Sequence, residues 1–410
     1  MPGLLRPTPY EPFGAAYSAI TARILCSPCF PRNGAARCPE SNSDEEVSTD
    51  LKKMLIPISL MVIASLALSC GGDDDKQTTS ATTSATGASP TEFPDSGPLT
   101  LHLGYFANVT HAVPLVGLNN GIFAQELGAN VTIDPKTFNA GPDVITAIFA
   151  GELDASYIGQ SPAVNGYVQS DGNDVRIVSG AASGGAALVV KPEITEPEQL
   201  SGKRIASPQL GNTQDIALRN WLKQNGVPAE ENGGDVKVIP TANADALTAF
   251  KNGDLDGGWA PEPWATRLVQ EGGGHILVDE KTLWPKGQFA TTVLIVRTDF
   301  LNDHPDTVQK LISANVKTVQ WIKQHTEEAK TLVNQQIEAV TSKALPKAVI
   351  DAAFPNVEFT YDPIQSSVET AAKQAYDLGL LQDNPDLADL FSLDILNIVL
   401  AKQGLTAVSR

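Results

Sequence analysis

Residues 147–154 read Ala-Ile-Phe-Ala-Gly-Glu-Leu-Asp, and residues 249–256 read Ala-Phe-Lys-Asn-Gly-Asp-Leu-Asp. After two intervening residues, each stretch is followed by an aromatic residue, Tyr157 in the first and Trp259 in the second. Each copy indicates a helix, a Gly that ends it, an acidic turn and a strand. The repeat predicts two similar α/β lobes. The alternative is that the copies share only the turn chemistry common to α/β chains.

From Leu99 onward, short apolar runs alternate with helical patterns. Runs typical of strands are 99–105, 131–134, 155–158, 176–179, 204–206, 236–239 and 257–260. Helical patterns cover 111–127, 142–150, 212–224 and 245–252, and apolar stripes starting at 308, 368 and 387 predict C-terminal helices. This alternation predicts mainly parallel sheets with helices on both faces. Stretches 186–190 and 289–296 are expected to join the lobes.

The N-terminal part has the pattern of a signal segment. Lys52 and Lys53 precede an apolar run over 55–68, which is too short to span a membrane but typical of a signal peptide. The run ends in Leu-Ala-Leu-Ser before Cys70, which resembles a bacterial lipobox and predicts acylation of the Cys70 thiol. The alternative is a plain signal peptide that happens to contain a Cys.

We therefore expect residues 1–53 to be a non-native upstream extension, with Met54 as the true start. Residues 54–69 are expected to be the lipoprotein signal peptide, and residues 70–98 the lipidated Cys70 and a tether. The Thr/Ser/Ala-rich composition after Cys70 cannot bury a core. Cys26 and Cys29 have the spacing of half a zinc site, but no second pair completes it, so no metal site is predicted.

Composition and motifs argue against two function classes. The formal net charge of −18 leaves no basic surplus for nucleic acid. The stretch Gly159-x-Ser161-x-Ala163 lacks the final Gly of a nucleophile elbow, and no His-Glu-x-x-His or phosphate-loop motif occurs. We therefore predict a protein that is not an enzyme and has no cofactor.

Four loops follow predicted strands at the edge where ligands of open α/β sheets bind. Ser161 before Pro162 places a hydroxyl and free amides at a helix start, which favours an anion. Gly184 and Gly185 would let backbone approach a ligand. The alternative for the polar residues is helix capping. The predicted binding residues on these loops are Asn108, Thr110, His111, Ser161, Ser183, Gly184, Gly185, Asn212 and Thr213.

The second lobe has an aromatic turn at the position that echoes Ser161, and its candidate residues are Trp259, Glu262 and Trp264. The aromatic rings can close over a bound carbon chain, and Glu262 can meet an amine. The alternative is that Trp264 packs in the core and Glu262 is a charge in the first turn of a helix.

Residues Leu99 to about Ile322 resemble the aliphatic sulfonate, taurine and nitrate class of ABC transporter substrate-binding proteins. Two of the motifs that carry the resemblance are Gly-Tyr-Phe-Ala-Asn-Val-Thr-His-Ala at 104–112 and Tyr-Ile-Gly-Gln-Ser-Pro-Ala at 157–163. The others lie at 137–142, 180–185, 209–215 and 261–264. Each motif alone is weak, and together they are specific.

The resemblance implies a type II periplasmic-binding fold, which is α/β with two Rossmann-like lobes joined by two hinge strands and followed by C-terminal helices. Lobe 1 is expected to comprise 99–187 plus 290–410, and lobe 2 to comprise 188–289. The resemblance also implies a small anion held by Ser161 and its helix amides, and an ABC permease with its ATPase as partners. Cys70 would then anchor the protein at the outer face of the cell membrane.

A related group on the same fold binds or makes thiamine-pyrimidine precursors, and this is the alternative function. Its enzymes use a cysteine-rich motif and a pyridoxal cofactor. This chain has no such cysteine cluster and no lysine in the four loops.

Overall fold

The computed structural model describes residues 93–409, all within one compact unit, Thr83–Arg410. The predicted extension at 1–53, the signal peptide at 54–69, the acylated Cys70 and most of the tether lie outside the described residues. Within residues 93–409, no helix has the length and apolar character needed to cross a membrane.

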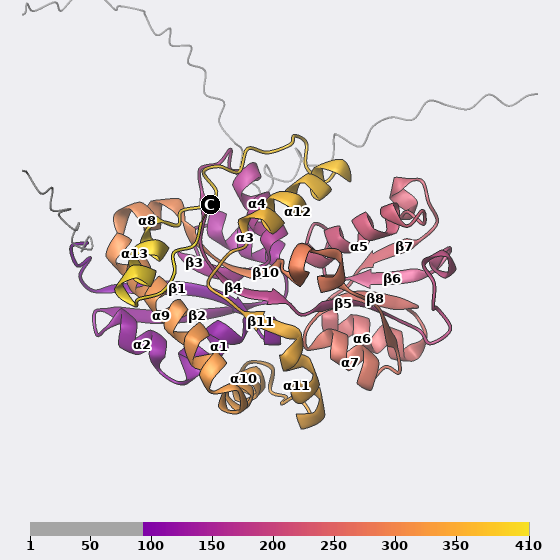
Figure 1. The fold of residues 1–410 in the computed structure, drawn as a ribbon, viewed down its shortest axis with the longest axis horizontal. Helices are drawn as coiled ribbons and strands as arrows, with labels where there is room; N and C mark the ends of the chain where they lie inside the picture. The colour runs from indigo at the N-terminus through magenta and orange to yellow at the C-terminus, as the bar shows by residue number, and fades with distance from the viewer. Residues whose placement is uncertain (1–92, 410) are drawn as a thin grey trace, which may run out of the picture. The chain divides into compact units, whose positions relative to one another are not determined.

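The strands of the described residues form two sheets, and each sheet is the centre of one lobe (Figure 1). The first sheet has the order β11-β4-β10-β3-β1-β2. Its strands are β1 (Leu99–Phe106), β2 (Val131–Phe138), β3 (Ala155–Ile158), β4 (Val175–Gly184), β10 (Ala290–Arg297) and β11 (Val357–Phe359). The second sheet has the order β7-β6-β8-β5-β9. Its strands are β5 (Ala186–Val190), β6 (Arg204–Ser207), β7 (Lys237–Pro240), β8 (Gly257–Pro261) and β9 (His275–Asp279).

The two sheets repeat one arrangement, which confirms the prediction of two similar α/β lobes. Strands β2, β1 and β3 are parallel neighbours in the first sheet, and β7, β6 and β8 are parallel neighbours in the second. An antiparallel strand follows in each sheet, β10 beside β3 and β5 beside β8. Most strands of each sheet therefore run in one direction, as predicted, and the prediction is wrong for β5, β10 and β11, which run against the others. Strands β5 and β10 arrive from the other lobe, without the crossover helix that parallel neighbours need.

Helices cover both faces of each sheet. Figure 1 shows α3 and α4 on one face of the first sheet, with α1 and α9 (Pro305–Gln324) on the other. Their bounds, with those of the other helices before β10, are α1 (Ala112–Asn119), α2 (Ile122–Leu127), α3 (Gly141–Phe149), α4 (Gln160–Gln169), α5 (Thr213–Gln224), α6 (Asn243–Asn252) and α7 (Trp264–Gln270). The single helix predicted over 111–127 is broken. A short 3-10 turn, η1 (Val109–His111), precedes α1, and Gly121 separates α1 from α2 with a left-handed φ of 81°.

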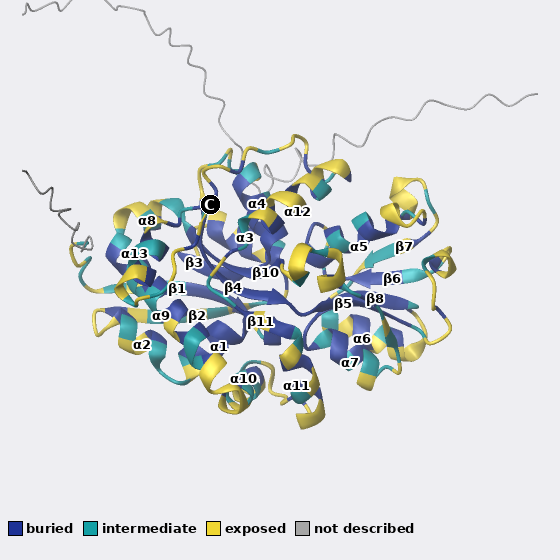
Figure 2. Cartoon of the chain, in the orientation of Figure 1, coloured by how far each residue is buried: buried dark blue, intermediate teal, exposed yellow. Residues whose placement is uncertain are grey.

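The cores follow the sheets, as the dark interior of Figure 2 shows. One apolar cluster fills lobe 1 and includes residues of β1, β3, β4 and β10. Lobe 2 has separate clusters on the two faces of its sheet. Leu188 and Val190 of β5 belong to one of these clusters, and Ala187 and Val189 belong to the other, because successive side chains of a strand point to opposite faces.

The chain crosses between the lobes at two places. The first crossing runs directly from β4 through Gly185 into β5. The return from β9 to β10 passes through short 3-10 turns, of which η4 (Glu280–Leu283) is the first. The predicted strand over 289–296 thus belongs to the first sheet as β10, and the crossing itself lies before it.

C-terminal helices follow β10, with the bounds α8 (Thr298–Asp303), α9 (Pro305–Gln324), α10 (Thr326–Thr341), α11 (Lys347–Ala353), α12 (Gln365–Asp377) and α13 (Asp394–Lys402). Helix α9 packs on α1 and α2, whereas α12 contacts α4 in lobe 1 and α5 in lobe 2. The predicted last stripe is only partly helical. Leu387 and Leu390 are buried in the irregular segment before α13. This segment is joined to β4 by a hydrogen bond from the Ile177 N–H to the Leu390 carbonyl oxygen.

Candidate ligand-binding site

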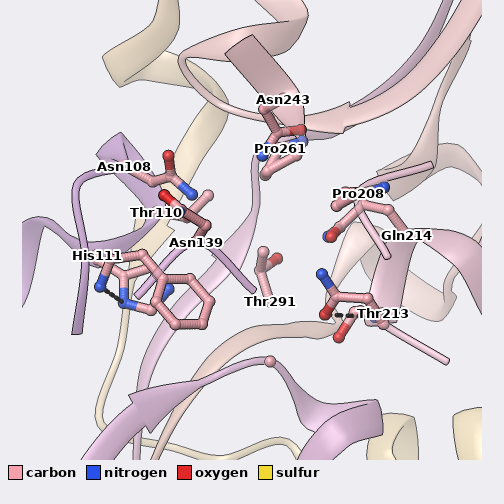
Figure 3. Close-up of a pocket in the computed structure, with 13 residues that line it drawn as sticks. Asn108, Thr110, His111, Asn139, Pro208, Thr213, Gln214, Asn243, Pro261 and Thr291 are labelled. Atoms are coloured by element: carbon pink, nitrogen blue, oxygen red, sulfur yellow. Dashed lines mark hydrogen bonds between the residues drawn. The ribbon is translucent and has the colours of Figure 1, made fainter. Parts of the chain in front are cut away.

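A pocket lies where loops of the two lobes meet, and its free space is about 330 Å³ including the part open to solvent. Only about 20 Å³ of it is cavity in which a water molecule would fit, so the lobes leave little room between them in this arrangement. The lining residues are Phe106, Asn108, Thr110, His111, Asn139, Gly159, Pro208, Asn212, Thr213, Gln214, Asn243, Pro261 and Thr291. Figure 3 shows side chains from both lobes turned toward this space.

Equivalent loops of the two lobes supply most of the lining. Lobe 1 contributes Asn108, Asn139 and Gly159 after its strands β1, β2 and β3, and lobe 2 contributes Asn212, Asn243 and Pro261 at or after the ends of the equivalent strands β6, β7 and β8. Across the pocket, the loop after β1 contacts the loop after β8, and the start of α4 after β3 contacts the start of α5 after β6. The pocket therefore lies at the carboxyl ends of the parallel strands, where open α/β sheets bind ligands.

In lobe 1, the loop after β1 is held by His111. Its Nδ1 accepts a hydrogen bond from the Phe106 N–H at 3.3 Å, and its ring stacks on Phe106 with ring centroids 4.3 Å apart. Burial lowers the pKa of His111 to about 3, so the imidazole is neutral at physiological pH. Because Nδ1 is the acceptor, the proton lies on Nε2.

In lobe 2, the loop after β6 is held by the fully buried Asp215. Its carboxylate accepts from the Gly211 N–H at 2.9 Å, the Ser207 hydroxyl at 2.6 Å and Arg219 Nε at 3.0 Å. Asn212 caps α5, because its Oδ1 accepts from the Thr213 N–H at 3.0 Å. The ion pair thus fixes the loop from behind, and the neutral side chains face the pocket.

The lobes touch around the pocket. The Ser161 N–H of lobe 1 donates to Thr213 Oγ1 of lobe 2 at 3.4 Å. Trp264 Nε1 of lobe 2 donates to Asn108 Oδ1 of lobe 1 at 2.8 Å. Next to the crossing, the Val109 N–H donates to the Glu262 carbonyl oxygen at 3.1 Å. These contacts give a closed arrangement of the two lobes.

Five of the predicted binding residues line this pocket: Asn108, Thr110, His111, Asn212 and Thr213. Ser161 lies beside it. Its buried hydroxyl has no hydrogen-bond partner among residues 93–409, and it lines a smaller neighbouring pocket formed with α5 and α12. The structure brings the Ser161 amide, but not its hydroxyl, to the contact between the lobes.

Ser183, Gly184 and Gly185 lie at the first crossing and do not line the pocket. Ser183 Oγ accepts from the Phe289 N–H at 3.2 Å, and the Gly184 carbonyl accepts from the Thr291 hydroxyl. The Gly185 carbonyl accepts from the Glu262 N–H at 2.8 Å. In this structure, their polar groups hold the crossing in place.

The candidate residues of the aromatic turn in lobe 2 also lie outside the pocket lining, although Pro261 of the same turn belongs to it. Trp259 is buried and donates from Nε1 to Glu280 Oε2 at 2.7 Å. Trp264 is half-buried, with the Arg267 guanidinium 4.6 Å from its ring centroid. In this structure both Trp side chains therefore pack against protein groups, which is the alternative to closing over a ligand.

Glu262 is turned away from the pocket and held by protein groups. Its carboxylate accepts from the Thr266 N–H at 3.1 Å, the Thr266 hydroxyl at 2.9 Å and Asn356 Nδ2 at 2.7 Å. Burial raises the pKa of Glu262, against the opposing effect of these donors. Three protein donors therefore already occupy the carboxylate, which leaves little of it for an amine.

The residues that the sequence analysis missed are Phe106, Asn139, Gly159, Pro208, Gln214, Asn243, Pro261 and Thr291. Asn139 follows β2, and Asn243 is the first residue of α6, so both lie just before or at the start of the helix that precedes a repeated segment. The repeat could have marked these two helix starts as equivalent, but its spacing aligns Asn139 with Thr241 and does not find Asn243. Thr291 carries no such signal, because it lies in an apolar strand.

Two α/β lobes around a pocket at their strand ends define the periplasmic-binding-protein fold. The chain belongs to the NMT1-like family, whose sequence model matches residues 95–337. The alkanesulfonate-binding protein SsuA from Xanthomonas axonopodis pv. citri bound to MOPS has the same fold, with a TM-score of 0.61 and 19% identity. That match covers 72% of this chain and 99% of the SsuA chain.

The curated relatives include the taurine-binding periplasmic protein of Escherichia coli (strain K12), which is 30% identical over 210 residues. The match covers 49% of this chain and 63% of the relative's length. A putative aliphatic sulfonates-binding protein of Bacillus subtilis (strain 168) is 28% identical over 244 residues, covering 58% of this chain and 69% of the relative. These relatives confirm the resemblance drawn from the sequence motifs.

Proposed function

We propose that the chain is the extracytoplasmic solute receptor of an ABC importer and captures a small sulfonate-like anion between its lobes. The pocket is the observation that carries this proposal. It combines uncharged hydrogen-bonding side chains from both lobes with the N-terminus of α5, whose helix dipole favours an anion. The names of the taurine-binding and sulfonate-binding relatives support the same ligand class.

The acidic charge of the whole chain does not prevent this. The formal net charge of −18 repels anions at long range. Charges beyond a Debye length of about 8 Å are screened at physiological ionic strength, whereas amide dipoles at the pocket act at contact distance. The local donors therefore decide the sign of the ligand.

We further propose that acyl chains on Cys70 hold the receptor at the outer face of the membrane, where it delivers its ligand to the permease and ATPase. Two or more acyl chains give stable anchoring, at about 0.8 kcal/mol per buried methylene. Replacing Cys70 by Ala should release the protein into the soluble fraction. A chain starting at Met54 should be exported and anchored as the full sequence is, and a loss of export would give residues 1–53 a function.

A pyrimidine is the competing ligand, because the stacked rings of Phe106 and His111 offer a flat surface at the pocket wall. A thermal-shift screen separates the two ligand classes. The ligands are taurine, alkanesulfonates, nitrate, bicarbonate and a thiamine-pyrimidine precursor. A ligand at 100 times its Kd should stabilise the protein by about 2.7 kcal/mol. Stabilisation by the pyrimidine alone would refute the anion proposal.

A further inference from the structure

Hydrogen bonds within the protein decide whether a pocket side chain offers its donor group or its acceptor group to the ligand. Asn108 Oδ1 is occupied by the Trp264 Nε1–H at 2.8 Å, so its NH₂ group remains for the pocket. Figure 3 shows the Asn108 nitrogen turned toward the pocket interior. Asn212 Oδ1 is likewise occupied by the Thr213 N–H at 3.0 Å, which again leaves the NH₂ group.

His111 and Thr213 are oriented in the same sense. His111 Nδ1 accepts from the Phe106 N–H at 3.3 Å, so the neutral ring offers an Nε2–H donor. Thr213 Oγ1 accepts from the Ser161 N–H at 3.4 Å, which leaves its hydroxyl hydrogen to donate elsewhere. Two side chains from each lobe therefore present donors to one small space.

No carboxylate balances these donors. Among the described residues, the pocket lining contains no Asp, Glu, Lys or Arg. Glu262 was the one predicted partner for an amine, and its oxygens are taken by Thr266 and Asn356. Asn139, Gln214 and Asn243 can accept from a neutral hydroxyl, but they carry no formal charge.

We propose that the pocket takes an anion without a cationic group and rejects the ammonium-bearing analogue of the same size. This inference rests on the proposed function and narrows its ligand class to sulfonates with an uncharged tail. An ammonium group has donors only, so it would face other donors and be buried without a counter-charge. Burying an unpaired charge is costly even where neutral acceptors are present.

Three ligands of nearly equal size test the inference: 2-hydroxyethanesulfonate, propane-1-sulfonate and taurine. They share the sulfonate and the two-carbon spacer and end in OH, CH₃ and NH₃⁺ respectively. Isothermal titration calorimetry on the wild-type protein should show both uncharged-tail ligands binding at least about 100-fold tighter than taurine, as expected for an uncompensated buried charge.

The outcomes separate this inference from the proposed function. Taurine binding within about tenfold of either analogue, a difference of about 1.4 kcal/mol or less, would overturn the inference and leave an anion receptor standing. Absence of binding by all sulfonates, nitrate and bicarbonate would overturn both.

A pair of variants checks that charge is the cause. Asn243→Asp adds a carboxylate to the pocket wall, and Asn243→Ala removes the same amide without adding charge. The affinity ratio of 2-hydroxyethanesulfonate to taurine should fall about tenfold further in the Asp variant than in the Ala variant, as a new counter-charge pairs with the ammonium. Equal ratios in the two variants would refute the electrostatic explanation.

Discussion

Tyr157 in β3 and Trp259 in β8 occupy equivalent positions in the two sheets, each paired with a Leu of the neighbouring antiparallel strand. Both are buried, and both donate one hydrogen bond inside their lobe. The Tyr157 hydroxyl donates to Asn315 Oδ1 at 2.9 Å, whereas Trp259 Nε1 donates to Glu280 Oε2 at 2.7 Å. The two aromatic residues thus occupy the same position in their lobes, but their acceptors differ: Asn315 is a neutral amide, whereas Glu280 is an acid that can ionise.

The same difference recurs in the loops that face the pocket. The loop after β1 is held by the neutral His111, which itself lines the pocket. The loop after β6 is held by the ion pair of Asp215 and Arg219, which lies behind it. At these two loops, lobe 2 therefore relies on buried charge where lobe 1 relies on a neutral group, and a change of charge there should affect lobe 2 more.

The largest effect is expected from Asp215→Ala. The substitution leaves the buried Arg219 without its main partner and frees the Gly211 N–H and the Ser207 hydroxyl. Breaking a buried pair costs about 3–5 kcal/mol. We expect the free energy of unfolding, measured in urea, to fall by about 3 kcal/mol, because Glu231 still contacts Arg219.

Glu231→Ala is the matched control for Asp215→Ala. It removes the half-exposed second partner of Arg219, and exposed pairs contribute about 1 kcal/mol or less. Similar losses in the two variants would contradict the view that Asp215 holds the loop after β6.

Glu280→Gln should change how stability depends on pH. Burial raises the pKa of Glu280 to about 7, above its ordinary value of 4.5, so the folded protein holds this proton more tightly than the unfolded chain. Between these values the folded state binds more protons, and stability falls as the pH rises from about 4.5 to about 7. The loss amounts to about 3 kcal/mol at most.

The Gln variant mimics the neutral acid. It should match wild type near pH 5 and exceed it near pH 8 by up to about 3 kcal/mol in thermal or urea unfolding. Asn315→Asp is the reciprocal control. It places a buried acid in lobe 1, so the stability of this variant should fall more steeply than that of wild type as the pH rises. A wild-type curve without any loss between these pH values would refute the assignment.

The repeat explains which features the sequence could predict. Helix, Gly, acidic turn and strand are set by residues close together in the chain, so β3 was predicted with both bounds correct and β8 to within one residue. The antiparallel positions of β5 and β10 depend on strands far apart in sequence. The sequence places these two apolar strands at the junction of the lobes, but no local pattern gives the direction in which such a strand pairs with its sheet.

The difference between local and long-range determinants also separates the predicted binding residues that line the pocket from those that do not. Asn108, His111 and Asn212 lie in loops that follow strands, and they do line the pocket. Trp259 lies within β8 and Glu262 directly after it, but long-range partners hold both outside the lining. Glu280 lies 21 residues from Trp259, and Asn356 lies 94 residues from Glu262. Such partners cannot be read from the spacing of nearby residues.

A smaller effect is expected from Gly159→Ala, which tests the closed arrangement. Gly159 has a φ of −68°, so Ala fits the backbone and changes only the contacts. A Cβ there would overlap Thr213 Oγ1 of the opposite lobe. Overpacking costs about 1–3 kcal/mol, so sulfonate affinity should fall about tenfold while the unligated protein keeps its stability.

The double variant with Thr213→Ser provides the control for Gly159→Ala. Ser lacks the methyl group that restricts χ1 in Thr, so its hydroxyl can rotate away and should restore part of the affinity. Unchanged calorimetric affinity in Gly159→Ala would show that the lobes do not approach this closely when ligand is bound.

The smallest effects concern the acidic turns of the repeat itself. Asp154 Oδ2 accepts from the His102 N–H at 2.9 Å, and Asp256 Oδ2 accepts from the Arg204 N–H at 2.8 Å, so each Asp ties its strand to the parallel neighbour. Asp154 has the more buried side chain, 10% against 23% exposed, and it pairs with Arg297, whereas Asp256 pairs with the partly exposed Arg204. We expect Asp154→Asn to cost about 1–2 kcal/mol and Asp256→Asn less than about 1 kcal/mol, because exposed charges are better screened. Urea unfolding of both variants measures the difference, and a larger loss in Asp256→Asn would show that burial is not what separates the two turns.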